Sequence, residues 1–230
     1  MSSFQRPKGP EDAWELLGPK LSPRRQQRLQ DVASQRTHYL RLALQDVNDP
    51  HNVGASLRSA DAFGVLNVDI ITLSEKFPQA SSTSRGSRHW MDLHRFKDLD
   101  AYASGVKALG YKIAAAYPAP DAVTLEALPI DQPLVIAFGN EQRGLHPDWQ
   151  KHIDYRFTIP MYGMVESFNI SVSVALSLHS LNRRCRESMS ESTYLLNAHD
   201  RLDLLGRWAC MQCEEPDLEL ERLRRARHQT

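Results

Sequence analysis

Short apolar strands alternate with helices along the middle of this chain, and this alternation constrains the fold more than any other feature. The strand-like runs are YLRLALQ (39–45), VDIITL (68–73), YKIAAAY (111–117), LVIAF (134–138) and a shorter run at 155–159. Helical patterns cover 50–63, 98–109 and 167–186. Such an order is typical of a parallel sheet with helices on both faces. The sequence therefore predicts an α/β domain over residues 39–186.

Two charged extensions flank this domain. Residues 1–38 read as helical from 11 to 36, where Ser22-Pro23 is a helix-start signal, and residues 187–230 read as helical from about 191. The formal net charge is zero, yet residues 1–45 hold eight Lys and Arg against four acids. Local basic patches of this kind fit contacts with nucleic-acid phosphates, although solvated helix faces have the same composition.

The composition indicates a cytoplasmic protein that has neither a membrane span nor a metal site. No apolar run approaches the roughly 18 residues of a membrane span, and the N-terminus has no signal-peptide core. Cysteines are few and odd in number, which disfavours a disulfide framework. Cys210 and Cys213 form a C-x-x-C motif, but no second pair completes a zinc site, so two ordinary helix cysteines are the simpler interpretation.

Three loops follow predicted strands and are candidates for ligand binding, because ligands of open α/β sheets lie beyond the carboxyl ends of strands. They are DVNDPHNVGASLR (46–58), GNEQRGL (139–145) and IPMYGMVESFN (159–169). The second loop has the glycine spacing of a phosphate cradle, but Leu145 and His146 stand where such a cradle needs Lys and Ser or Thr. The first loop contains only Gly54, which disfavours a dinucleotide-binding G-x-G-x-x-G loop.

The same loops carry a resemblance to a known family. N-V-G-A-S-L-R (52–58), L-V-I-A-F-G-N-E-Q-R-G-L (134–145) and I-P-M-Y-G-M-V-E-S-F-N-I-S-V-S-V-A (159–175) resemble the three motifs of the SpoU branch of the SPOUT RNA 2′-O-methyltransferases. The similarity spans about residues 38–186, and it is closest to the TrmH type, which methylates the D-loop guanosine of tRNA. It implies a C-terminal trefoil knot, S-adenosylmethionine as cofactor, and a homodimer whose contact includes the helix at 167–186.

The resemblance also implies catalytic roles for five residues. Arg58 matches the arginine that the family uses in deprotonating the ribose hydroxyl. Since a guanidinium stays protonated in proteins, we interpret Arg58 as a ligand of the RNA phosphate and of the developing alkoxide. Asn52 is expected to orient Arg58 or the substrate, and Glu141 to position Arg58 or the ribose. Ser167 and Asn169 match residues at the substrate and cofactor, although both also suit the capping of the next helix.

Further positions match cofactor contacts of the family, namely Ala116, Gly139, Ile159 and Phe168. Phe168 stands where the family often has leucine, and a backbone contact should tolerate this difference. Outside the motifs, the loop STSRGSRHW (82–90) is the best candidate for RNA binding, through Arg85, Arg88 and His89.

Two alternatives to tRNA guanosine methylation remain open from the sequence. The first is the same chemistry on ribosomal RNA or on another tRNA nucleotide. The rRNA relatives often carry a separate N-terminal RNA-binding domain, for which residues 1–38 are too short, and this favours tRNA. The second is a non-catalytic RNA-binding module of the same fold, which the intact motif residues disfavour.

Overall fold

The computed structural model describes residue 4 and residues 9–73 and 86–227, which form two compact units. One unit contains Phe4 and Thr37–Tyr194, and the other contains the described parts of Gln5–Arg36 and Leu195–Thr230. The α/β domain was predicted to span residues 39–186. The α/β unit continues instead through α6 (Glu191–Tyr194), which packs against the first strand and the preceding helix.

The α/β unit is built on a seven-stranded sheet in the order β3-β2-β1-β6-β4-β7-β5. All its strand pairs are parallel, which confirms the predicted parallel α/β fold. The strands are β1 (Thr37–Gln45), β2 (Val65–Ile71), β3 (Asp92–Phe96), β4 (Lys112–Ala116), β5 (Val123–Thr124), β6 (Leu134–Phe138) and β7 (Tyr155–Thr158). Leu44 of β1 lies opposite Phe138 of β6 and Ile70 of β2, so the carboxyl ends of neighbouring strands meet at one edge.

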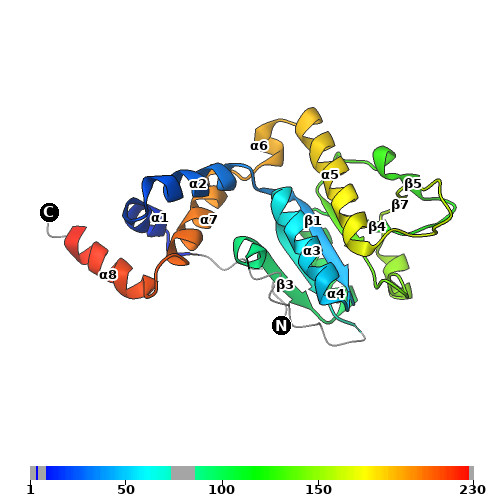
Figure 1. Ribbon diagram of the computed structural model, residues 1–230, viewed down its shortest axis with the longest axis horizontal. Helices are drawn as coiled ribbons and strands as arrows, with labels where there is room; N and C mark the ends of the chain where they lie inside the picture. The colour runs from blue at the N-terminus through cyan, green and yellow to red at the C-terminus, as the bar shows by residue number, and fades with distance from the viewer. Residues whose placement is uncertain (1–3, 5–8, 74–85, 228–230) are drawn as a thin grey trace. The chain divides into compact units, whose positions relative to one another are not determined.

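Helices cover this sheet. Figure 1 shows α3 (Pro50–Ala62) and α5 (Ile170–Ser188) side by side in front of β1, and the two helices contact each other. The helix α4 (Leu99–Ala108) packs through Tyr102 and Val106 into a core that includes Trp149 of the 3₁₀ turn η5 (Pro147–Lys151). Two further 3₁₀ turns, η3 (Ser87–Trp90) and η4 (Leu125–Ala127), lie in connecting segments.

The structure differs from the sequence-based expectations at several boundaries. The strands β3 and β5 were not predicted, because DLHRF is largely polar and β5 has only two residues. The helix expected from 167 begins at Ile170. The helical stretch at 11–36 is interrupted at 21–22, where Ser22 caps the following helix by accepting a hydrogen bond from the Arg25 backbone N–H.

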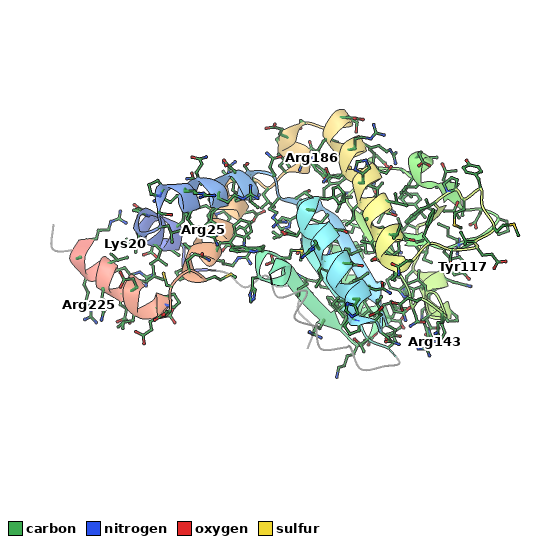
Figure 2. All side chains as sticks on the ribbon, viewed as in Figure 1. Lys20, Arg25, Tyr117, Arg143, Arg186 and Arg225 are labelled. Carbon is green, nitrogen blue, oxygen red and sulfur yellow. The ribbon has the colours of Figure 1, made fainter. Side chains whose placement is uncertain are left out.

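The second unit joins the two terminal segments, which the sequence analysis treated separately. It contains α1 (Ala13–Leu17), η1 (Gly18–Lys20), α2 (Pro23–Ser34), α7 (Ala198–Cys210) and α8 (Pro216–Arg227). Leu17 and Leu220 pack in its core with two buried alanines, and Arg224 makes a two-pronged ion pair with Asp12 at 2.6 and 2.7 Å. Figure 2 labels basic side chains of this unit, among them Arg25 and Arg225. None of the helices in the described ranges combines the length and apolar character that a membrane span needs.

Candidate active site

The strand order brings the predicted ligand-binding loops to one edge of the sheet. The loop after β1 lies beside the loop after β6, because these strands are neighbours. The strands β6, β4 and β7 then follow in order, so Gly139, Ala116 and Ile159 all stand at or just beyond adjacent carboxyl ends. The cofactor positions that the sequence analysis named on three separate strands therefore lie along one edge.

Three of the predicted catalytic residues form a chain of hydrogen bonds. The side-chain amide of Asn52 donates to a Glu141 carboxylate oxygen at 2.9 Å, and the Asn169 amide donates to the Asn52 amide oxygen at 3.0 Å. These residues come from α3, from the loop after β6 and from the start of α5. The chain therefore connects all three motifs in one cluster, although the residues lie far apart in the sequence.

Local capping explains why two of these residues are fixed. Asp49 caps α3 by accepting from the His51 backbone N–H, which places Asn52 in the first turn of the helix. Asn169 caps α5, and its side-chain oxygen accepts from the backbone N–H and the hydroxyl of Ser171. Asn169 thus caps the helix, as its sequence allowed, and also contacts Asn52. Ser167 does not cap α5 and lies exposed in the preceding loop.

Arg58 lies apart from this chain of hydrogen bonds. It is exposed on α3, and among the residues that the structure describes it makes no hydrogen bond to Asn52 or Glu141. Arg58 is six positions after Asn52, which is about one and two-thirds helical turns, so the two side chains leave α3 on different faces. Glu141 accepts from Asn52 rather than from Arg58. Arg58 is therefore open to solvent rather than part of this cluster.

The loop from Gly139 to Leu145 is shaped by Asn140. The Asn140 side-chain oxygen accepts from the backbone N–H groups of Gln142 and Arg143 at 2.9 and 3.0 Å. Its backbone exchanges two hydrogen bonds with Gly144, which has a left-handed φ of 68° that favours glycine. A polar hollow of about 560 Å³ lies between this loop and the loop after β1, lined by Asn52 and Glu141 among others. Figure 2 places Arg143 toward the end of the unit where α5 begins.

The loop after β7 is exposed throughout from Met161 to Asn169. It carries apolar side chains that water would ordinarily disfavour: Tyr162 and Met164 are 97% and 99% exposed, and Phe168 is 37% exposed. The helix α5 carries two further exposed apolar residues one helical turn apart, Val172 and Leu176, which are 43% and 39% exposed. We call this group of exposed side chains the α5 apolar surface.

The predicted RNA-binding residues are only partly within the described chain. Arg85 lies outside the described residues, and the Arg88 side chain is likewise outside them. His89 is exposed and belongs to η3, which packs against α3, the helix that carries Asn52 and Arg58. Trp90 is half-buried.

The C-x-x-C cysteines do not have the environment of reactive thiols. Burial raises the pKa of the Cys210 thiol, so it stays protonated at neutral pH. Cys213 is half-buried and donates to the Ala209 carbonyl. Within residues 9–73 and 86–227, no group of three or more His, Cys, Asp or Glu side chains is placed to hold a metal ion.

Sequence reasoning missed three residues that organise the site, namely Gln45, Asp46 and Asn140. Gln45 looked like a solvent-facing residue of an alternating strand, and Asn140 looked like one polar residue among several in its loop. All three are buried. One usable signal was present in Asn140, because Asn in a glycine-flanked loop commonly hydrogen-bonds the backbone two residues on.

Comparison with known proteins decides the family. Residues 39–179 match the SpoU rRNA methylase family, and this stretch is more than half of the chain. The chain belongs to this family. SpoU proteins are S-adenosylmethionine-dependent RNA 2′-O-methyltransferases, and the matched range contains the whole cluster of Asn52, Glu141 and Asn169.

Relatives of this SpoU chain include named tRNA-modifying enzymes. It is 32% identical over 189 residues to the tRNA (guanosine(18)-2′-O)-methyltransferase of Borreliella burgdorferi, covering 82% of this chain and 86% of the relative. It is 29% identical to the protein of that name from Escherichia coli K12, covering 71% of this chain and 72% of the relative.

Solved structures agree on the fold. The A. aeolicus TrmH/SpoU tRNA modifying enzyme superposes with a TM-score of 0.74 at 26% identity, covering 82% of this chain and 96% of that one. An AdoMet-bound rRNA methyltransferase from Sinorhizobium meliloti shares the fold with a TM-score of 0.58 at 24% identity, covering 70% and 61% of the two chains.

Proposed function

We propose that this SpoU chain transfers a methyl group from S-adenosylmethionine to the ribose 2′-hydroxyl of guanosine 18 in the D-loop of tRNA. The observation that carries the proposal is the hydrogen-bonded cluster of Asn52, Glu141 and Asn169, which unites the three motifs. The choice of guanosine 18 is supported by relatives of that name, which align over most of this chain.

The cofactor edge has the chemistry that S-adenosylmethionine requires. Ala116 has only a methyl side chain and Gly139 has none, and both residues are partly exposed at adjacent strand ends. We assign the adenosine and methionine parts of the cofactor to backbone around Ala116, Gly139, Ile159 and Phe168. When bound, the cofactor supplies an electrophilic methyl group on a sulfonium.

Arg58 is proposed to act on the RNA rather than on the cofactor. Its exposed guanidinium can bind a phosphate and the oxygen that becomes an alkoxide as the 2′-hydroxyl loses its proton. The proton leaves to the neighbouring phosphate or to water, because a guanidinium is too weak a base to accept it. Arg58 thereby lowers the energy of the developing negative charge.

The polar cluster is proposed to position the ribose. Glu141 accepts from Asn52 through one carboxylate oxygen, and its exposed position leaves the carboxylate accessible to a ribose hydroxyl. Asn169 holds the Asn52 amide oxygen, which fixes the direction in which the Asn52 amide donates. Ser167 is exposed next to this group and is assigned to the substrate and cofactor. Arg85, Arg88 and His89 are proposed RNA contacts.

Methylation assays on different RNAs separate the proposed function from its alternatives. We expect the protein, given labelled S-adenosylmethionine, to label unmodified bulk tRNA and to leave ribosomal RNA unlabelled. Label in rRNA or at another tRNA nucleotide would instead support the same chemistry on a different substrate. Binding of tRNA without any binding of S-adenosylmethionine would support a non-catalytic RNA-binding module.

The proposal includes a homodimer and a trefoil knot. The α5 apolar surface supports the dimer, because several large exposed apolar side chains in one segment commonly mark a protein interface. The knot is proposed from the resemblance of residues 159–175 to the family's C-terminal motif.

A charge on the α5 apolar surface should dissociate this dimer. Leu176 is 39% exposed at the α5 end of that surface, so we expect Leu176→Glu to give a monomer in sedimentation at micromolar concentration, where the unmodified protein is a dimer. The control is Leu109→Glu, since Leu109 is 54% exposed at the end of α4 and should leave the dimer intact. A monomeric unmodified protein, or a dimeric Leu176→Glu variant, would contradict the proposed interface.

A further inference from the structure

The carboxyl end of β1 carries two buried polar residues that the proposed mechanism does not use, Gln45 and Asp46. Only 3% of Gln45 and 5% of Asp46 is exposed. Asp46 also has a left-handed φ of 49°, the one such non-glycine residue in the described chain. Buried polar side chains in a strained backbone need a compensating set of contacts.

Those contacts reach the loops on both sides of β1. The Asp46 carboxylate accepts from the Leu73 backbone N–H at 2.9 Å through one oxygen and from the Gln45 side-chain amide at 2.6 Å through the other. The Gln45 side-chain oxygen in turn accepts from the His146 backbone N–H at 2.7 Å. The Asp46 backbone carbonyl accepts from the Asn140 side-chain amide at 2.9 Å.

The direction of every bond in this series is fixed by chemistry. A backbone N–H can only donate, so the oxygen of the Gln45 amide must face His146 and its NH₂ group must face Asp46. An ionised carboxylate can only accept, which suits Asp46 toward both Gln45 and Leu73. The Gln45 amide can therefore link the Asp46 carboxylate to the His146 backbone N–H in only one of its two orientations.

The two loop ends held by this series are the ends of the proposed cofactor loop. Asn140 stands next to Gly139, and His146 follows Leu145. Both attachments lead back to the end of β1, which lies between β2 and β6 in the sheet. A shift of Gln45 or Asp46 would consequently move the loop at both ends.

We propose that Asp46 and Gln45 are positioning residues for the cofactor loop, with the Asp46 carboxylate fixing the loop through the Gln45 amide. This inference rests on the proposed function, because it assigns the 139–145 loop to S-adenosylmethionine. The residues act through the loop backbone and do not touch the reacting atoms.

Exchanging the Asp46 carboxylate with the Gln45 amide tests the proposal, because the double variant keeps the net charge of the protein. In Asp46→Asn, the new side-chain oxygen accepts from the Leu73 backbone N–H, so its NH₂ group faces the NH₂ group of Gln45 and two donors meet. If the Gln45 amide turns over, its NH₂ group faces the His146 backbone N–H instead, and two donors meet there. In Gln45→Glu, two carboxylates face each other. In the double variant Gln45→Glu/Asp46→Asn, the carboxylate introduced at position 45 accepts from the His146 backbone N–H and from the amide introduced at position 46. The oxygen of that new amide accepts from the Leu73 backbone N–H, so each donor has an acceptor again.

Two readouts are measured on each variant: calorimetric binding of S-adenosylhomocysteine and hydrogen exchange of the His146 backbone amide. We expect each single variant to bind at least ~10-fold more weakly and to exchange His146 faster, because a buried charge-assisted hydrogen bond is lost. The double variant should return both readouts to within about threefold of the unmodified protein, a difference smaller than the loss of one net hydrogen bond.

Asp154→Asn is the matched control. The Asp154 carboxylate also accepts from a backbone N–H, that of Ile113 at 2.9 Å, but it does so at the start of β4, away from the cofactor edge. We expect it to lower the melting temperature without changing affinity for S-adenosylhomocysteine or exchange at His146.

The outcomes separate this inference from the proposed function. Unchanged binding and exchange in Asp46→Asn would overturn the positioning role, and so would a folded double variant that stays as impaired as the singles. If a single variant does not fold, recovery of folding, binding and His146 protection in the double variant supports the role, and continued loss of protection overturns it. If the unmodified protein binds no S-adenosylhomocysteine, the proposed function fails, while His146 exchange still decides whether Asp46 holds the loop.

Discussion

Arg58→Ala should slow methyl transfer by ~100-fold or more while leaving the affinity for S-adenosylmethionine nearly unchanged, as expected when one donor aimed at a developing charge is removed. The structure supports this separation, because Arg58 is exposed on α3 and, among the described residues, makes no hydrogen bond to the 139–145 loop assigned to the cofactor. Arg58→Lys should restore little, because an ammonium cannot reproduce the planar two-pronged contact with a phosphate. The measurement is the single-turnover rate at saturating tRNA and cofactor.

Two other arginine variants serve as controls for that rate. Arg225→Ala removes an exposed arginine of α8, and it should leave the single-turnover rate unchanged when tRNA is saturating. Arg88→Ala should weaken tRNA binding and reduce its salt dependence, with a smaller effect on the saturated rate. Transfer at the normal rate by Arg58→Ala would show that Arg58 only binds RNA, and the proposed stabilisation of the alkoxide would be wrong.

Gly139→Ala should strongly weaken cofactor binding. A Cβ atom at this position would lie 2.1 Å from the Gly144 carbonyl carbon and 2.2 Å from the Leu145 nitrogen. Both are backbone atoms, so no side chain can move aside and the loop itself must shift. Overpacking typically costs about 1–3 kcal/mol and each tenfold in Kd is about 1.4 kcal/mol, so we expect Kd for S-adenosylhomocysteine to rise by ~100-fold.

Gly86→Ala is the matched control for this variant. Nothing lies within 4 Å of a Cβ built on Gly86, and its backbone conformation is open to other residues. We expect it to bind S-adenosylhomocysteine as the unmodified protein does, by calorimetry. Equal affinities of Gly139→Ala and Gly86→Ala would contradict the assignment of the 139–145 loop to the cofactor.

The α/β fold could be predicted because its strands carry strong local signals. LVIAF was predicted at its observed bounds, 134–138, since a continuous apolar run suits a strand buried on both faces. In β1 the leucines alternate with polar or small residues, a pattern typical of a half-buried strand, but Arg41 and Gln45 are buried as well. Arg41 is accommodated by a two-pronged pair with Asp69 at 2.6 and 2.9 Å, and such partners on other strands cannot be read from one strand's pattern.

The site was predictable in its parts but not in its connections. The motif resemblance named Asn52, Glu141 and Asn169, and capping chemistry explained Asn169. That Asn52 bridges the other two depends on strand order, since β1 and β6 become neighbours only when the sheet forms. The left-handed backbone of Asp46 likewise follows from contacts to Leu73 and Asn140, which are distant in sequence.

The most direct test of the central claim compares two tRNA molecules that differ by one oxygen atom. One is an unmodified transcript, and the other carries 2′-deoxyguanosine at the position named in the relatives, guanosine 18. Each is incubated with the protein and S-adenosylmethionine, and the methylated nucleotide is mapped by mass spectrometry. We predict a single 2′-O-methylguanosine at position 18 of the first tRNA and no methylation of the second. Methylation of the deoxy-substituted tRNA, or at any other nucleotide of the first, would contradict the proposed function.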